Sequence, residues 1–133
     1  MRIVAGKHRG RILNSPDNNL IRPTSDKVRL ALFNALNSRG AVVDAIVLDA
    51  FCGTGALALE ALSQGAAQAV LIDQAKPSLD LAKKNAEMLK ETGNCVFLLK
   101  DATKISAKPE SQTPATLCFL DPPYRKDILP EVL

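Results

Sequence analysis

The chain has 133 residues, close to half of them hydrophobic, and a net charge of +3, which suits one globular domain with a buried core. It contains one His and three widely spaced Cys, so we expect no metal site and no disulfide framework, but free thiols in a reducing cytoplasm. No hydrophobic run approaches the ~18 residues of a membrane span, and no hydrophobic signal segment follows the N-terminus, so the sequence predicts a cytoplasmic protein without a membrane anchor.

The first predicted element is a short β-hairpin at residues 2–13, where hydrophobic and basic positions alternate around Gly6 and Gly10. Residues 1–40 contain eight Lys or Arg and two Asp, whereas the rest of the chain is net acidic. A basic region of this kind is typical of proteins that bind phosphates, although a tail that only improves solubility would have the same composition. The side chains predicted to face phosphates are Arg2, Lys7, Arg9, Arg11 and Arg22.

After a predicted loop at residues 14–20, the pattern predicts a helix from Thr24 to about Ser38. Thr24 can act as its N-cap, Asp26 lies in its first turn, and Gly40 follows its end. Its hydrophobic face is expected to consist of Val28, Leu32, Ala35 and Leu36, with Arg22, Lys27 and Arg29 on the polar side.

From residue 41 onward, hydrophobic runs alternate with helical patterns. Strands are predicted at 46–50, 69–73, 95–99 and 116–120, with a polar irregular segment at 104–114. Helices are predicted at 56–64, ended by Gly65, and at 77–92, ended by Gly93 and hydrophobic at Leu79, Ala82, Ala86 and Leu89. This alternation predicts an α/β fold with a mostly parallel sheet covered on both faces. We expect residues 1–40 to form a basic hairpin and helix, and residues 41–133 to form the core domain.

The turn after the first predicted strand, Asp49-Ala-Phe51-Cys-Gly53-Thr-Gly55, is a candidate ligand loop. Glycines in a strand-to-helix turn let backbone N–H groups approach a ligand closely. Because the turn also matches the dinucleotide pattern and Asp73 has the spacing of a ribose-binding acid, a nicotinamide or flavin enzyme is an alternative, as is a turn without a ligand. The Asp49 carboxylate, however, would repel a pyrophosphate and attract an ammonium. S-adenosylmethionine carries an ammonium and a ribose, and so fits both aspartates.

On this assignment Asp49 faces the methionine ammonium, the amides around Gly53 and Gly55 lie along the ligand, and Asp73 binds the ribose hydroxyls. Asp101-Ala102, at the end of the third predicted strand, would meet the adenine edge, although an aspartate that only caps the strand is an equally good interpretation. Cys52 lies in the same turn, but no His is near it in sequence to activate it. We therefore do not expect nucleophilic catalysis by Cys52.

Asp121-Pro122-Pro-Tyr124 follows the fourth predicted strand directly. The carboxyl edge of a parallel sheet is where α/β folds bind ligands, although Asp and Pro also favour turns without a function. The Asp121 carboxylate and the Pro122 carbonyl can accept the two N–H groups of an exocyclic amine and aim its lone pair at a sulfonium methyl, while Tyr124 stacks on the base. No strong general base is needed, because the proton can leave after transfer. The motif therefore predicts methyl transfer to a base amine.

These motifs resemble the bacterial RsmD family of S-adenosylmethionine-dependent methyltransferases, which modify the N2 amine of one guanine in 16S ribosomal RNA. The resemblance runs through the whole chain, in the basic segment from Arg2, in Arg22-Pro-Thr-Ser-Asp-Lys-Val-Arg29, in Leu32-Phe-Asn34, in the Asp49 turn and in the Asp121 motif. It implies a Rossmann-like methyltransferase sheet, of which the first four strands are present. It also implies an RNA-facing basic hairpin, with 16S ribosomal RNA or a small-subunit precursor as the partner. The helix at residues 24–38 would lie near the cofactor, which adds Thr24 and Arg29 to the expected cofactor-binding residues, and the resemblance in the Asp49 turn adds Phe51.

The sequence departs from the family in two respects. The ribose-binding acid is often Glu in relatives and is Asp73 here, and relatives continue beyond residue 133 with further strands. We therefore expect the fourth strand to be an exposed sheet edge and a site for self-association. Two alternatives stay open, namely a noncatalytic RNA-binding remnant and an N6-adenine DNA methyltransferase that shares the Asp-Pro-Pro-Tyr chemistry.

Overall fold

The computed structural model describes residues 1–15, 23–101 and 115–120, and of residues 23–25 the backbone only. The predicted segment 104–114 and most of the predicted loop 14–20 lie outside these residues. Within the described ranges no helix is both long and hydrophobic enough to cross a bilayer. The elements in chain order are α1 (Pro23–Ser38), β1 (Ile46–Asp49), α2 (Ala56–Ser63), β2 (Gln68–Asp73), α3 (Lys76–Met88), the 3-10 helix η1 (Thr92–Asn94), β3 (Cys95–Leu99) and β4 (Leu117–Phe119).

The four strands form one parallel sheet in the order β3-β2-β1-β4, which confirms the predicted α/β class. The chain runs from β1 outward to β2 and β3, and then returns to place β4 on the other side of β1. The strand order therefore reverses between β1 and β4, and open parallel sheets bind their ligands at the carboxyl ends of the strands that flank such a point. In the described residues β4 pairs only with β1, as expected for an edge strand. Self-association through this edge stays a prediction.

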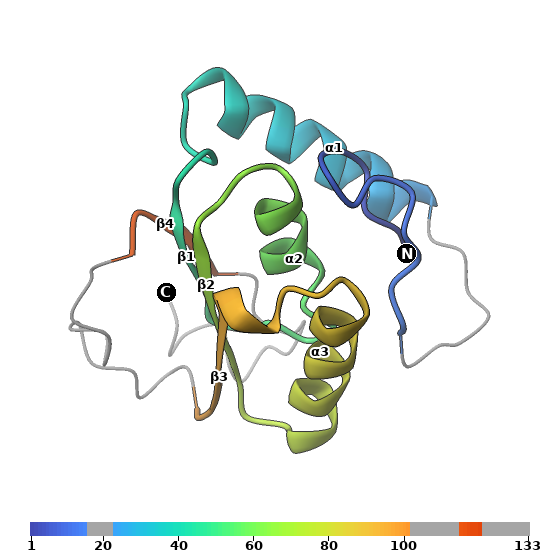
Figure 1. Ribbon diagram of the computed structural model, residues 1–133, viewed down its shortest axis with the longest axis vertical. Coiled ribbons are helices and arrows are strands. Elements are labelled where there is room, and N and C mark those ends of the chain that lie inside the picture. The colour runs from blue at the N-terminus through green and yellow to red at the C-terminus, as the bar shows by residue number, and fades with distance from the viewer. Residues whose placement is uncertain (16–22, 102–114, 121–133) are drawn as a thin grey trace, which may run out of the picture.

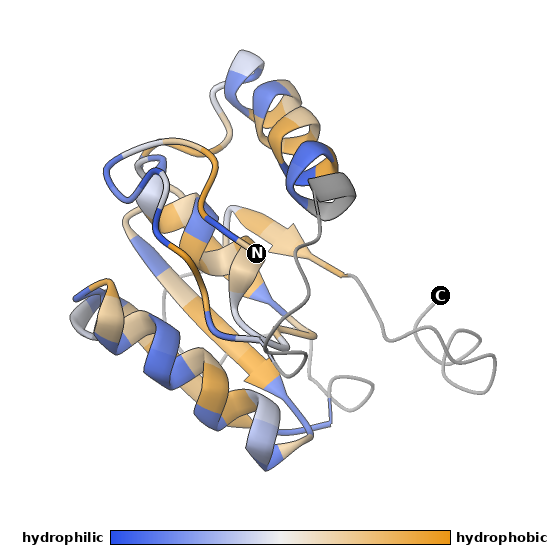
Figure 2. Ribbon diagram, turned by 90° about the vertical axis from the view of Figure 1, so that its right-hand side faces the viewer, coloured by the Kyte–Doolittle hydropathy of each residue, from blue (hydrophilic) through white to orange (hydrophobic). Residues whose placement is uncertain are grey.

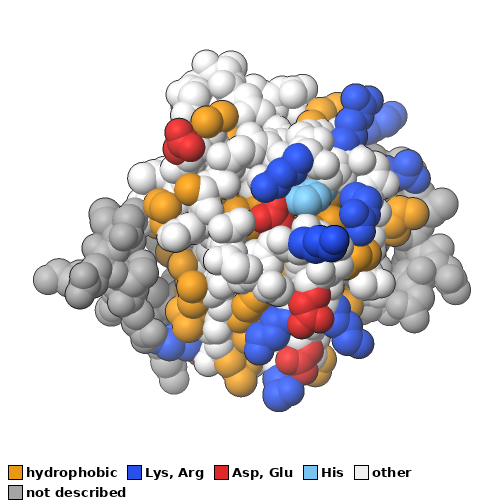
Figure 3. Space-filling view, in the orientation of Figure 1, with side chains coloured by type: hydrophobic (Ala, Val, Ile, Leu, Met, Phe, Trp, Pro, Cys, Tyr) orange, Lys and Arg blue, Asp and Glu red, His pale blue; other side chains and the backbone are white. Residues whose placement is uncertain are grey.

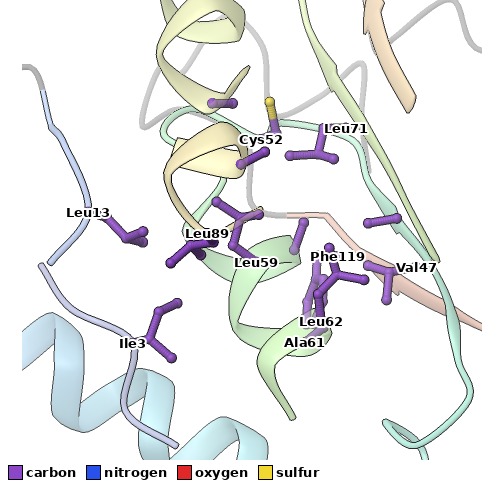
Figure 4. Close-up of a cluster of buried hydrophobic side chains, with 14 of the residues drawn as sticks. Ile3, Leu13, Val47, Cys52, Leu59, Ala61, Leu62, Leu71, Leu89 and Phe119 are labelled. Atoms are coloured by element: carbon purple, nitrogen blue, oxygen red, sulfur yellow. The ribbon is translucent and has the colours of Figure 1, made fainter. Parts of the chain in front are cut away.

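The helices α2 and α3 lie side by side on one face of the sheet (Figure 1). The strands are mostly hydrophobic, whereas α3 carries both hydrophobic and hydrophilic residues (Figure 2). Val47, Leu71 and Phe119 project from the sheet into a core that also contains Leu59 and Leu62 of α2 (Figure 4). The predicted hydrophobic positions of α3 are buried in this core. Each large side chain removed from water here contributes about 1.5–3 kcal/mol.

The structure describes helices on one face of the sheet only. On the other face, Val96 is 51% exposed and Cys118 is exposed, while Leu48 and Val70 are partly buried. Coverage of this second face stays a prediction.

The N-terminal segment, residues 1–14, contains the predicted hairpin in a reduced form. A single antiparallel bridge joins Arg2 to Ile12, and the Leu13 N–H donates to the Met1 carbonyl at 2.9 Å. Further along, the Val4 N–H donates to Glu60 Oε1 at 2.9 Å and the Lys7 N–H donates to a carbonyl of α2, that of Ser63, at 2.9 Å. Because α2 takes these N–H groups, few remain to pair across a regular hairpin. Ile3 and Leu13 instead enter the core (Figure 4).

Over residues 26–38, whose side chains the structure describes, α1 buries only part of the predicted face, since Leu36 packs against the core but Ala35 is exposed. The buried positions of α1 are Arg29 and Phe33, and the Phe33 ring packs against Phe119 at 5.8 Å between centroids. Val28 and Leu32, predicted to be buried, are 63% and 37% exposed. Arg29 can be buried because Glu60 Oε1 accepts from its Nε at 3.0 Å, a partner that periodicity within the helix does not reveal. The helix also begins one residue before Thr24, so Thr24 lies in its first turn rather than at its N-cap.

The helix α3 ends at Met88, before the predicted end near Gly93. Lys90 adopts a left-handed conformation (φ 59°), and the N–H groups of Lys90 and Glu91 donate to the carbonyls of Glu87 and Ala86. This pattern usually uses Gly, as at Gly40 and Gly65 after α1 and α2, because a side chain in that conformation costs roughly 1–2 kcal/mol. At Lys90 this conformational cost is offset by the hydrogen bonds of the next residue, Glu91.

That residue, Glu91, is 2% exposed and accepts hydrogen bonds from Lys7 Nζ at 2.9 Å, His8 Nε2 at 2.6 Å and Asn94 Nδ2 at 2.9 Å. Burial by itself would raise the pKa of Glu91, but the hydrogen bonds from Asn94, His8 and Lys7 and the charge of Lys7 lower it below the ordinary value of 4.5. Ionised Glu91 therefore holds the N-terminal segment against the end of α3.

We expect Glu91 to make stability depend on pH at the acid end. Because its folded pKa lies below the unfolded one, its contribution is complete above about pH 4.5 and is lost as the pH falls through the folded pKa. Urea unfolding at a series of pH values should show Glu91→Gln less stable than the original chain at neutral pH, with the difference shrinking in acid. Glu87→Gln, at an exposed position of α3, is the control. A difference that stays constant with pH would contradict this assignment.

Candidate functional site at the carboxyl edge of the sheet

The turn between β1 and α2 has the backbone conformation that a ligand loop needs. Gly53 (φ 52°) and Gly55 (φ 83°) are both in the left-handed region. A Cβ on Gly55 would lie 3.2 Å from a methyl of Leu71 and 3.3 Å from the Cβ of Ala82, so a side chain here would be tightly packed as well as strained by the positive φ. A Cβ on Gly53 would meet no atom within 4 Å. The backbone of Gly53 therefore faces open space, and a ligand can approach it closely.

The carboxylate of Asp73, at the end of β2, is hydrogen-bonded to this turn. Its Oδ2 accepts from the Gly53 N–H at 3.0 Å, and its Oδ1 accepts from the Ala75 N–H at 2.8 Å. Each carboxylate oxygen can accept a second hydrogen bond, so hydroxyl groups of a ligand can still bind there. Asp73 thus both fixes the glycine turn and presents an acceptor beside it.

Two further aspartates lie at the same edge of the sheet. Asp49 is the last residue of β1, and Asp101 follows the end of β3 by two residues. Asp49 is 1% exposed. Burial, and then the negative charges of Asp49 and Asp73, raise the pKa of the Cys52 thiol well above its ordinary value. Since the thiolate is the reactive form, this environment disfavours Cys52 as a nucleophile.

A pocket of about 610 Å³ opens beside the turn, where the strand order reverses between β1 and β4. Gly53 and Thr54 line it from the turn, and the end of β4 lines it with Phe119 and Leu120, the residue before the Asp121 motif. Val28 and Leu32 of α1 line it too, which accounts for two hydrophobic side chains that the core does not cover. The remaining lining residues are Met1, Arg29, Phe51, Cys52, Ala56, Leu57 and Cys118.

Of the predicted cofactor residues, Arg29, Phe51 and Gly53 line the pocket, whereas Asp49, Gly55, Asp73 and Asp101 lie at the same edge of the sheet outside its lining. Asp49, Phe51, Gly53, Gly55 and Asp73 belong to β1, the turn and the end of β2, and Asp101 follows β3. Arg29 reaches the pocket, but its guanidinium is bonded to Asp26 Oδ1 at 2.8 Å and to Glu60. Thr24 lies in α1. The predicted residues outside the described ranges are Arg22, Ala102, Asp121, Pro122 and Tyr124.

Sequence reasoning missed two buried polar residues next to the site. Asn85 of α3 is fully buried and bonded to Thr54 in the turn, and Glu60 of α2 is fully buried against Arg29. The available signal was a polar residue within a hydrophobic helix face, since Asn85 lies between Ala82 and Leu89. Such a residue needs hydrogen-bond partners, but the sequence does not say which residues supply them.

The basic side chains predicted to face phosphates, Arg2, Lys7, Arg9 and Arg11, are exposed. Figure 3 shows Lys and Arg side chains gathered around the single histidine of the chain, His8. Arg11 donates from its guanidinium to the Met88 carbonyl at 3.1 Å, at the C-terminal end of α3. The tip of the N-terminal segment, residues 6–11, is therefore a positively charged surface held against α2 and α3. We call these residues the basic tip.

The parallel sheet, the glycine turn after β1 and the acid at the end of β2 form a Rossmann-like fold, and similarity to known proteins identifies it as the methyltransferase type. Residues 1–133 match the family described as conserved hypothetical protein 95, so the chain belongs to this family, the RsmD family. The resemblance drawn from the sequence is confirmed.

Two curated relatives and one solved structure illustrate the similarity. The chain is 42% identical over 133 residues to ribosomal RNA small subunit methyltransferase D of Escherichia coli K12, and covers 65% of that protein. It is 32% identical over 139 residues to the putative rRNA methyltransferase YlbH of Bacillus subtilis, of which it covers 72%. The solved structure of the putative methyltransferase yhhF from Escherichia coli superimposes with a TM-score of 0.81 at 39% identity, over 99% of this chain and 69% of that one. The chain thus spans about two thirds of the length of these relatives.

Proposed function

We propose that this protein transfers a methyl group from S-adenosylmethionine to the exocyclic N2 amine of a guanine in 16S ribosomal RNA, as free RNA or in a small-subunit precursor, in the cytoplasm. The observation that carries the proposal is the open side of Gly53, which lies beside the Asp73 carboxylate and a pocket that reaches Leu120. The relatives named as small-subunit ribosomal RNA methyltransferases support the substrate class.

When bound, S-adenosylmethionine supplies a methyl group activated by a positively charged sulfur. Asp49 would hold its ammonium, because a buried carboxylate interacts strongly with a positive charge. The amides around Gly53 and Gly55 would lie along the ligand, Asp73 would accept from its ribose hydroxyls, and Asp101 with Ala102 would meet the adenine edge. The resemblance adds Thr24, Arg29 and Phe51 to this set, and of these Arg29 and Phe51 line the pocket.

The target amine would be held by the motif after β4. The Asp121 carboxylate and the Pro122 carbonyl would accept its two N–H groups, and Tyr124 would stack on the base. The hydrophobic wall made by Val28, Leu32 and Phe119 would exclude water from the pocket, which strengthens the polar contacts within it. The main task of these residues is to aim the amine lone pair at the methyl group.

Replacing Asp73 with Ala tests the cofactor assignment. We expect the Kd for S-adenosylmethionine, measured by calorimetry, to rise by an amount equivalent to about 1–3 kcal/mol, because the ribose loses its acceptor. Since Asp73 also fixes the turn, the thermal stability of the variant should be measured beside its affinity. Asp80→Ala, which removes a carboxylate of α3 that is paired with the exposed Lys76, is the control and should bind normally. Tighter binding of NADH than of S-adenosylmethionine would overturn the assignment.

The RNA surface can be tested through the salt dependence of binding. If Arg2, Lys7, Arg9 and Arg11 contact phosphates, log affinity for a 16S fragment should fall with log salt with a slope near −0.7 per phosphate contacted on a single strand. Changing all four to Ala should weaken binding and flatten this slope. A control variant with Lys27, Arg39, Lys76 and Lys83 changed to Ala removes as many exposed charges elsewhere. Equal loss in both variants would place the RNA surface elsewhere.

A further inference from the structure

The N-terminal segment contacts the glycine turn at both of its ends. At one end, the Thr54 hydroxyl lies 3.8 Å from the Met1 sulfur, and Met1 lines the pocket. At the other end, Asn14 is joined to Thr54 through the side chain of Asn85. The Leu13 N–H also donates a hydrogen bond to the Met1 carbonyl at 2.9 Å. The two ends of the segment therefore form one unit beside the turn.

The basic tip of the same segment is attached to α2, the helix that begins at the turn. The Lys7 N–H donates to the Ser63 carbonyl at 2.9 Å, and the His8 N–H donates to the Ser63 hydroxyl at 2.9 Å. A Cβ on Gly6 would lie 2.0 Å from the Ser63 carbonyl oxygen, so the backbone here approaches α2 as closely as it can. The basic tip and the turn are thus connected through packed, hydrogen-bonded structure.

Asn85 has the one kind of side chain that can make this connection. Its Oδ1 accepts from the Asn14 N–H at 2.8 Å, while its Nδ2 donates to the Asn14 carbonyl at 3.0 Å and to the Thr54 carbonyl at 2.8 Å. One donor and two acceptors face it, so the orientation of the amide is fixed by its partners. A carboxylate of the same shape would keep the first bond but place an oxygen against two carbonyl oxygens.

We propose that Asn85 is a positioning residue that couples the N-terminal segment to the cofactor turn, so that RNA bound at the basic tip and S-adenosylmethionine bound at the turn each raise the affinity for the other. This inference rests on the proposed function. Thr54 lies between Gly53 and Gly55, so the hydrogen bond to its carbonyl helps to fix the backbone of the turn along which the cofactor would lie. A ligand that orders either partner of Asn85 lowers the entropy that the second ligand has to remove on binding, which makes the coupling positive.

The coupling can be measured as a change in affinity. The Kd for S-adenosylmethionine is determined by calorimetry on the full chain, with and without a saturating 16S ribosomal RNA fragment. We expect RNA to lower this Kd by about fivefold or more in the original chain. By linkage, S-adenosylmethionine should lower the Kd for RNA by the same factor. In Asn85→Asp each ligand should still bind alone. The factor by which one ligand lowers the Kd for the other should fall to about one.

A matched control is Val42→Ala, a fully buried hydrophobic position four residues before β1, near the amino edge of the sheet. It creates a cavity without touching Asn14 or Thr54, and should keep the coupling. A factor that survives in Asn85→Asp, or one that disappears equally in Val42→Ala, would overturn the proposal. An original chain that binds both ligands without coupling would also overturn it, while leaving the proposed function intact. No binding of S-adenosylmethionine at all would overturn the proposed function itself, and this inference with it.

A second measurement needs no variant, and so stands even if Asn85→Asp does not fold. Hydrogen exchange of the amides at residues 53–55 should slow when the RNA fragment alone is added, and exchange at residues 6–11 should slow when S-adenosylmethionine alone is added. Protection confined to the site of the added ligand would show that the two sites are independent.

Discussion

Replacing Asp121 with Ala should lower the rate of methyl transfer on the order of 10²-fold or more while leaving S-adenosylmethionine affinity almost unchanged. The amine of guanine is a poor nucleophile because its lone pair is delocalised into the ring. Its reactivity therefore depends on how well its two N–H groups are held. The carboxylate at Asp121 would supply one of the two acceptors, and its loss would affect the transition state far more than the bound cofactor.

The experiment is a single-turnover measurement of methyl transfer to a 16S fragment, with cofactor affinity determined in parallel. It should be run on this chain and on one extended with the C-terminal residues of the Escherichia coli relative, which is the longer protein. Tyr124→Phe keeps the stacking ring and should be mild, whereas Tyr124→Ala should not. If the extended chain methylates guanine equally fast with Asp121→Ala, the mechanism is wrong even though the family is right. Transfer to adenine in DNA in preference to guanine in RNA would favour the alternative substrate.

Replacing Glu60 with Ala should lower the free energy of unfolding by about 3–5 kcal/mol. Glu60 is fully buried and accepts from Arg29 Nε at 3.0 Å, from the Val4 N–H at 2.9 Å and from the Ala5 N–H at 3.2 Å. The substitution leaves a guanidinium that is 5% exposed without one of its carboxylate partners, together with two N–H groups of the N-terminal segment. Each of these groups would have to give up its position or remain unsatisfied in a site that excludes water.

Chemical denaturation of the Glu60 variants measures this effect. Glu60→Gln keeps an acceptor oxygen and should cost less than Glu60→Ala. The control is Asp80→Ala, which breaks the exposed pair between Lys76 Nζ and Asp80 Oδ2 at 2.9 Å and should leave the free energy of unfolding essentially unchanged. Because Glu60 anchors the N-terminal segment, RNA affinity should also fall in Glu60→Ala. A Glu60→Ala variant as stable as Asp80→Ala would show that the Arg29 pair contributes little.

The sequence by itself determined the fold class, the position of each strand to within a residue or two, and the glycine turn with its acid at the end of β2. These features are local. A run of hydrophobic residues between turn signals indicates a buried strand wherever its partners lie. The positive φ of Gly55 is a local requirement of the turn, although the closest side chains around it, those of Leu71 and Ala82, come from β2 and α3. The family could likewise be identified from short motifs, and the comparison with known proteins confirmed it.

Only the tertiary structure decided which polar groups are buried and what they hold. Periodicity placed Arg29 on the exposed side of α1, but Glu60, 31 residues away, makes its burial favourable and turns Val28 and Leu32 toward the pocket instead. Glu91 is held by Lys7 and His8 and follows a left-handed Lys90, so that α3 ends at Met88 rather than near Gly93. The burial of Asn85 is explained by its hydrogen bonds to Asn14 and Thr54. In each case a buried polar group is stable only when partners distant in the sequence satisfy it, and the positions of those partners are set by the folded chain.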